Sequence, residues 1–130
     1  MYRATTRSIE ITVVPRFLEE RSSPGRVEYL WTYTIEIVNR GSQTVQLKTR
    51  YWRITDAAGR VREVRGDGVV GAQPVLEPAQ SFEYTSNVPL PTPSGFMVGS
   101  YRMVTAEGEA FDVEIPAFSL DSPSPSRTLN

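Results

Sequence analysis

The sequence contains neither cysteine nor histidine among its 130 residues. Without cysteine, the chain forms no disulfide and offers no thiolate for catalysis or metal binding. Without histidine as well, it cannot build the common nucleophile–base pairs or the soft and borderline metal sites from its own residues. We therefore predict a protein that is not an enzyme and that uses no cofactor and no metal site.

Long apolar runs and an excess charge of one sign are also missing. No run approaches the ~18 apolar residues that a membrane helix needs, and residues 1–17 lack the pattern of a signal peptide. Lys48 is the single lysine, and the formal net charge is -1. The chain as a whole therefore exerts no electrostatic attraction on nucleic acid or on anionic membranes. We predict a cytoplasmic protein that binds neither nucleic acid nor membrane.

What the sequence does contain is a series of short segments in which apolar and polar residues alternate, as is typical of half-buried β-strands. The predicted strands are 9–17, 27–39, 44–55, 60–64, a segment around Phe82 and Tyr84, 96–105 and 110–116. The apolar parity changes near Tyr51 and Trp52, which predicts a bulge or a strand covered on both sides. The pattern indicates an all-β fold, an antiparallel β-sandwich of the immunoglobulin or fibronectin III type with about seven strands.

The segments between these strands carry turn signals. We predict turns at 19–26 and 56–59, a tight hairpin at Glu107-Gly108, and a rigid crossing loop over the proline-rich residues 88–95. The polar tail 121–130 is predicted to be disordered, so that a single domain spans 1–120.

Gly66, Gly68 and Gly71 have the G-x-G-x-x-G spacing of dinucleotide-binding proteins. Such a site needs a helix after the glycines, and Pro74 and Pro78 forbid a helix interior there. We interpret the glycines as positions of positive φ or close backbone approach, where the chain crosses between sheets. An alternative remains, in which the loop amides form an anion-binding concavity for a pyrophosphate or nucleotide. Its candidate ligand-binding residues are Arg65, Gly66, Asp67, Gly68 and Gly71.

Two further groups of residues have a structural and a functional interpretation. The aromatic residues Trp31, Trp52 and Tyr101 could stack bases, but without a basic surplus they are better interpreted as core. Five carboxylates could bind a hard cation, but they lack calcium-loop spacing and are better interpreted as a solvated strand face. These carboxylates are Glu19, Glu20, Asp67, Asp112 and Glu114.

Several ordered blocks closely resemble the ApaG proteins of bacteria. They are YTIEIVN (33–39), RYWRITD (50–56), RGDGVVGAQPVLEP (65–78), FEYTS (82–86), GFMVGSY (95–101) and FDVEIPAFSL (111–120). The resemblance implies a fibronectin III-like sandwich. It also implies a protein-interaction module, because similar domains occur in a eukaryotic F-box protein and in a polymerase-associated protein. The bacterial genes tend to lie near a diadenosine tetraphosphate hydrolase gene, and the family has been linked to magnesium and cobalt homeostasis.

Two departures from the family pattern carry expectations of their own. The family often has histidine where this chain has Tyr51, so a direct cobalt role for that histidine cannot operate here. The family also favours Pro-Gly where this chain has Pro78-Ala79, which predicts that this turn does not require positive φ. We expect a non-catalytic module that binds another protein; the alternative is a small-ligand sensor that binds pyrophosphate or a nucleotide at 66–71.

Overall fold

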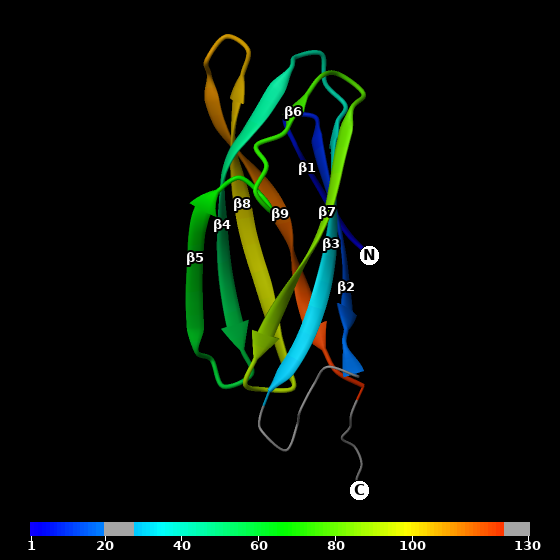
Figure 1. Cartoon of the computed structure of the whole chain (residues 1–130), viewed down its shortest axis with the longest axis vertical. Helices are drawn as coiled ribbons and strands as arrows, with labels where there is room; N and C mark the ends of the chain where they lie inside the picture. The colour runs from blue at the N-terminus through cyan, green and yellow to red at the C-terminus, as the bar shows by residue number, and fades with distance from the viewer. Residues whose placement is uncertain (20–27, 124–130) are drawn as a thin grey trace, which may run out of the picture.

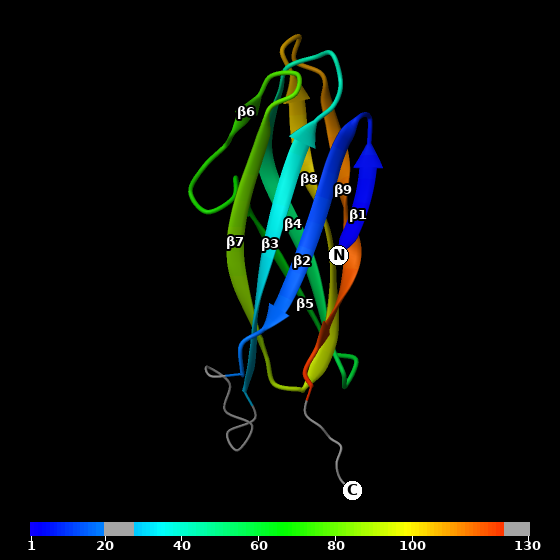
Figure 2. The same cartoon turned by 90° about the vertical axis from the view of Figure 1, so that its right-hand side faces the viewer.

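The computed structural model describes residues 1–19 and 28–123, and this part of the chain forms two antiparallel sheets packed face to face (Figures 1 and 2). The first sheet has the order β1 (Tyr2–Thr6), β2 (Ile9–Phe17), β3 (Tyr29–Asn39) and β7 (Ser81–Leu90). The second has the order β5 (Val61–Asp67), β4 (Val45–Asp56), β8 (Ser94–Thr105) and β9 (Ala110–Asp121), with β6 (Val75–Leu76) paired to β4. The predicted antiparallel sandwich is confirmed, with nine described strands in place of seven.

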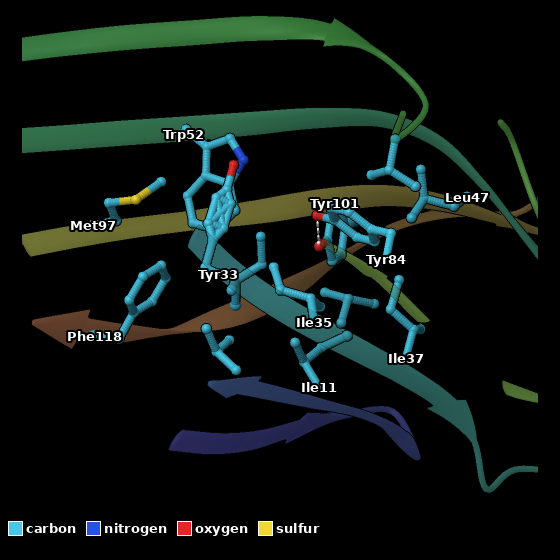
Figure 3. Packing of buried hydrophobic residues seen from close by; sticks show 14 of the residues in the cluster. Ile11, Tyr33, Ile35, Ile37, Leu47, Trp52, Tyr84, Met97, Tyr101 and Phe118 are labelled. Atoms are coloured by element: carbon cyan, nitrogen blue, oxygen red, sulfur yellow. Dashed lines mark hydrogen bonds between the residues drawn. The ribbon is translucent and has the colours of Figure 1, made fainter. Parts of the chain in front are cut away.

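The core lies between the sheets and is built from the inward-facing residues of both (Figure 3). On β3 the predicted alternation is confirmed, since Trp31, Tyr33, Ile35 and Ile37 are all buried. Trp31 and Tyr101 are among the largest fully buried side chains and Trp52 is 3% exposed, so the interpretation of these three aromatics as core is confirmed.

Two tyrosine hydroxyls meet inside this core. Tyr84 Oη on β7 lies 2.5 Å from Tyr101 Oη on β8, so the hydrogen bond joins one sheet to the other (Figure 3). Burial raises the pKa of both phenols above the usual value. Both hydroxyls therefore stay protonated at neutral pH.

A β-bulge on β4 explains its change of parity. The register between β4 and β8 shifts between Leu47 and Thr49, so the extra residue is Lys48. Of the two predicted explanations, a bulge or a strand covered on both sides, the bulge is the one that forms, three residues before the predicted position near Tyr51 and Trp52. As a result Leu47 and Trp52 face the core, while Tyr51 lies on the outer face with Glu63.

The hairpin of β1 and β2 was not predicted. Its two-residue turn, Arg7-Ser8, has φ of 48° and 68°, a conformation that Asn-Gly usually occupies. Neither residue signals such a turn, and β1 alternates only weakly. Figure 2 shows β1 at the edge of its sheet, beside β2 and near β9. There the hydroxyl of Tyr2 lies 3.1 Å from Ser119 Oγ.

The prediction for the turn at Pro78-Ala79 is wrong. Ala79 has φ of 74°, and Gln80 donates its amide hydrogen to the Glu77 carbonyl at 2.9 Å. This is a type II turn, whose third position favours glycine. Ala79 also donates its amide to the Asn39 carbonyl at 2.7 Å, a bond that helps hold this alanine in the left-handed region.

The rigid loop predicted over 88–95 is also wrong in its extent. β7 runs to Leu90 and β8 begins at Ser94, so three residues cross from one sheet to the other. Pro89 is tolerated because β7 is an edge strand, where a missing N–H need not break a ladder. β9 likewise continues past its predicted end at residue 116 and ends at Asp121. Its pairing with β8 contains a second register shift, between Met97 and Gly99 of β8.

Two predictions fall mainly on residues that the structure leaves out. Of the predicted turn at 19–26 only Glu19 is described, and of the predicted tail 121–130 only 121–123 are. Asp121 is the last residue of β9. Within the described ranges, no helix is long and apolar enough to cross a membrane.

Candidate functional site

The glycine motif begins at the end of β5 and continues into the loop before β6. This loop projects from the sandwich beside β7 (Figure 2). Gly66 pairs with Arg50 across β5 and β4. A Cβ at Gly66 would lie 2.8–2.9 Å from the guanidinium of Arg50, so the missing side chain lets this guanidinium cross the Gly66 backbone. Arg50 Nη1 then donates to the carbonyls of Asp67 and Gly68, at 3.0 Å each.

Gly68 and Gly71 have the left-handed conformation that the sequence predicted as one possibility. Their φ angles are 62° and 82°. A Cβ at Gly68 would lie 2.2 Å from the Ala72 carbonyl oxygen, whereas nothing lies within 4 Å of one at Gly71. At position 68 glycine is therefore required both by the positive φ and by the nearby Ala72 carbonyl, which leaves no room for a side chain. At position 71 only the positive φ favours glycine.

The loop closes on itself through a two-residue turn, Val70-Gly71. Val69 and Ala72 exchange amide-to-carbonyl hydrogen bonds of 2.8 and 2.9 Å, and Val70 has φ of 42°. Positive φ at both central residues is the type I′ geometry. Val69 is buried at 1% exposure, while Val70 is 61% exposed. Val69 therefore anchors the turn in the core, and the side chain of Val70 points to solvent.

The β4 bulge holds this loop in place. Lys48 accepts hydrogen bonds at its carbonyl from the Gly68 amide at 2.9 Å and from Gln73 Nε2 at 2.8 Å. Leu47 donates its amide to the Pro74 carbonyl at 3.0 Å. The amides of Gly68, Val69 and Ala72 thus all bond to protein carbonyls, and the chain continues into β6 instead of a helix.

Arg65 and Asp67 project from the outer face of β5 beside a surface hollow of about 820 Å³. The hollow is lined by Thr49, Arg50, Tyr51, Arg65, Gly66, Asp67, Ser100, Arg102 and Asp112. Arg65, Gly66 and Asp67 are thus brought together, while Gly68 and Gly71 lie farther along the loop. Ligand binding by these five residues stays a prediction.

The side chains around this hollow are linked on the β4–β5 surface. Arg65 Cζ lies 4.7 Å from the centroid of the Tyr51 ring, and the Tyr51 hydroxyl donates to Glu63 Oε2 at 2.6 Å. The hydrogen bond raises the pKa of Tyr51 and lowers that of Glu63, because it favours the phenol and the carboxylate. Tyr51 therefore serves as a hydrogen-bond donor on this surface.

Sequence reasoning missed Arg50, Arg102 and Ser100 as lining residues. They come from β4 and β8, and their place beside Gly66 follows from strand register, which the alternation of single strands does not specify. Of the carboxylates considered for a cation, Glu20 lies outside the described residues. Among those that are described, no group of three or more acidic residues is placed to hold a metal ion.

A sequence model of the ApaG domain (DUF525) matches residues 19–105, more than half of the chain. The chain belongs to the ApaG family. Its full length aligns with the full length of Protein ApaG from Rhodopseudomonas palustris (strain TIE-1) at 62% identity, and with that from Afipia carboxidovorans at 63%.

Solved structures agree with this ApaG assignment. The chain is similar to the crystal structure of a Bordetella pertussis protein called ApaA, with a TM-score of 0.88 and 45% identity. That match covers 93% of this chain and 98% of the other. An X-ray structure of another structural genomics target gives a TM-score of 0.85 at 43% identity, covering 95% and 93%. The resemblance inferred from the sequence blocks is therefore confirmed.

Proposed function

We propose that this ApaG-family protein is a non-catalytic binding module of the cytoplasm, and that it contacts another protein through the loop 68–74. One observation carries the proposal: Val70 is a β-branched residue held at positive φ and exposed at the tip of a fastened turn. Strained backbone that the surroundings enforce is typical of functional sites. Rigid scaffolds commonly carry binding on such loops.

The chemistry of the chain favours binding over catalysis. With no histidine and no cysteine, the nucleophile–base arrangements of most group-transfer enzymes have no members here. One arginine and one carboxylate that line the hollow, Arg102 and Asp112, form an ion pair at 2.8 Å. Arginine and carboxylate side chains on such a surface suit recognition of a partner.

Site-specific photo-crosslinking tests the loop as a contact surface. A photoreactive residue in place of Val70 should form one specific protein adduct in cell extract. The same residue in place of Val14, which is 45% exposed on the other sheet, should form none. Excess wild-type protein without the photoreactive residue should compete the adduct away, whereas excess Val70→Asp protein, with an unchanged melting temperature, should not. Equal labelling from both positions, or turnover of a nucleotide by the purified protein, would refute the proposal.

A small-ligand function has support from one further observation, the gathering of Arg50, Arg65 and Arg102 around the hollow beside Gly66. Guanidinium forks suit phosphate oxygens. Pyrophosphate or a dinucleoside polyphosphate should then shift the backbone amide NMR signals of residues 66–71. Unmoved signals at millimolar ligand would eliminate this second function.

A further inference from the structure

A groove follows the side of the sandwich where the two edge strands β5 and β7 face each other. Its deeper part is a cleft of about 190 Å³, lined on both sheets. Trp52, Val88 and Met97 belong to the buried core and form an apolar floor. Arg62 and Asn87 are exposed at its rim. The cleft thus combines an apolar base with a polar opening.

A second hollow of about 200 Å³ continues the cleft toward the link between β7 and β8. It is lined by residues of β5 and by Pro89, Leu90 and Pro91. The two hollows share Ile54, Arg62 and Pro89, so they form one elongated groove with Arg62 where they meet. This shape suits an extended chain better than a compact small molecule.

The groove carries positive charge that nearby carboxylates leave unbalanced. None of the residues lining the deeper cleft is acidic, and no described carboxylate forms an ion pair with Arg62 or Arg50. Arg50 uses Nη1 for two backbone carbonyls, and its other guanidinium donors have no acceptor among the described residues. In the second hollow, Asp56 is already paired with Arg60 at 3.0 Å.

We propose that this groove binds an extended acidic segment of a partner protein, an inference that rests on the proposed binding role and adds a second contact surface to it. A carboxylate of the segment pairs with the guanidinium of Arg62, and a neighbouring one reaches the free donors of Arg50. Apolar side chains between the acidic ones cover the floor at Trp52 and Met97. The outward backbone groups of β7, which ends its sheet, supply main-chain hydrogen bonds.

NMR titration of the purified protein tests this assignment. The probe is a blocked hexapeptide of alternating valine and glutamate, and the matched control peptide has lysine in place of glutamate. The acidic peptide should shift the backbone amides of Arg62, Val64, Ser86 and Asn87 in a saturable way, while the lysine peptide leaves them unmoved. Binding should weaken as salt is raised, since the paired charges are partly exposed.

Charge reversal provides the matched protein variants. Arg62→Glu should weaken binding of the acidic peptide by about tenfold, through the loss of one charged pair and a new repulsion. Arg16→Glu makes the same charge change on an exposed residue of β2, outside the groove, and should alter affinity by less than about twofold. Because neither arginine has an ion pair in the described chain, both variants should melt as the wild type does.

The proposal is overturned if millimolar acidic peptide leaves the four amides unmoved, or if both charge reversals weaken binding equally. It is also overturned if inorganic phosphate at the same concentration reproduces the shifts and displaces the peptide, which would mark a simple oxyanion site. Peptide binding without crosslinking at position 70 would refute the loop surface alone. Crosslinking without peptide binding would refute the groove alone.

Discussion

Ala79 stands at the third position of a type II turn, with φ of 74°. An L-residue in the left-handed region costs roughly 1–2 kcal/mol, and glycine avoids that cost while losing some entropy on folding. We expect Ala79→Gly to raise the free energy of unfolding by about 1 kcal/mol, a rise of roughly 4 °C in melting temperature. Calorimetry of the two proteins measures this directly.

Ala57 provides the control for that substitution. It also lies in a turn, but its φ is not positive, so Ala57→Gly should lower stability slightly through the added freedom of the unfolded chain. A fall in melting temperature with Ala79→Gly would contradict the strain assigned to this alanine.

The glycine motif shows which part of the site could be predicted from single residues. The downstream prolines excluded the helix that a dinucleotide site requires, and the positive φ predicted for the glycines is confirmed at Gly68 and Gly71. The predicted crossing between sheets at this loop is wrong, because β5 and β6 both pair with β4; the chain crosses to the other sheet after β6, before β7. The role of Gly66 could not be predicted. It depends on the guanidinium of Arg50, which reaches Gly66 only through the register of β4 against β5.

The turn between β4 and β5 depends on the carboxylate of Asp56, whose side chain is 6% exposed. Burial alone would raise the pKa of this carboxyl, but amide hydrogens from Arg60 and Ala58 and the Arg60 guanidinium outweigh burial and lower it. The folded state therefore holds the ionised form better than the unfolded state does. The resulting stabilisation is present above the ordinary pKa of 3.8 and is lost as pH falls through the lower folded value.

Asp56→Asn tests this dependence, because the amide oxygen can still accept the turn hydrogen bonds while the charge is gone. The variant should be less stable than the wild type near pH 6, and the difference should shrink at pH 3. Urea unfolding at both pH values measures it. Asp112→Asn, at an exposed pair with Arg102, should change stability little at either pH. A difference for Asp56→Asn that does not vary with pH would rule out the charge as its cause.

Strands could be predicted where apolar and polar residues alternate strongly. They were missed where a segment is extended only because it pairs with a strand distant in the sequence. β3 alternates through its whole length, whereas β6 is two residues long and exists through its pairing with Val45 and Gln46. The three prolines of the stretch 88–95, together with its lack of helical register, predict a rigid crossing loop. Its first residues nevertheless extend β7, whose outer edge needs no amide from Pro89.

At the scale of the whole molecule, the Tyr84–Tyr101 hydrogen bond ties the two sheets together inside the core. Replacing either tyrosine with phenylalanine leaves the other hydroxyl buried without this partner, at an expected cost of about 1–2 kcal/mol. The double variant removes both polar groups and should cost clearly less than the sum of the single variants. Urea unfolding of the wild type, the two single variants and the double variant measures this coupling free energy. Strictly additive losses of stability would mean that the two hydroxyls do not depend on each other.

The contact between the first and last strands has a consequence for biosynthesis. Tyr2 of β1 meets Phe118 and Ser119 of β9, with the Tyr2 and Phe118 ring centroids 6.1 Å apart. Because translation proceeds from the N-terminus, the ribosome must release all residues from Tyr2 to Ser119 before this contact can form. Until β9 emerges, β8 lacks one neighbour and the apolar faces that meet β9 stay open to other nascent chains. Completion of the sandwich therefore waits until β9 has left the ribosome.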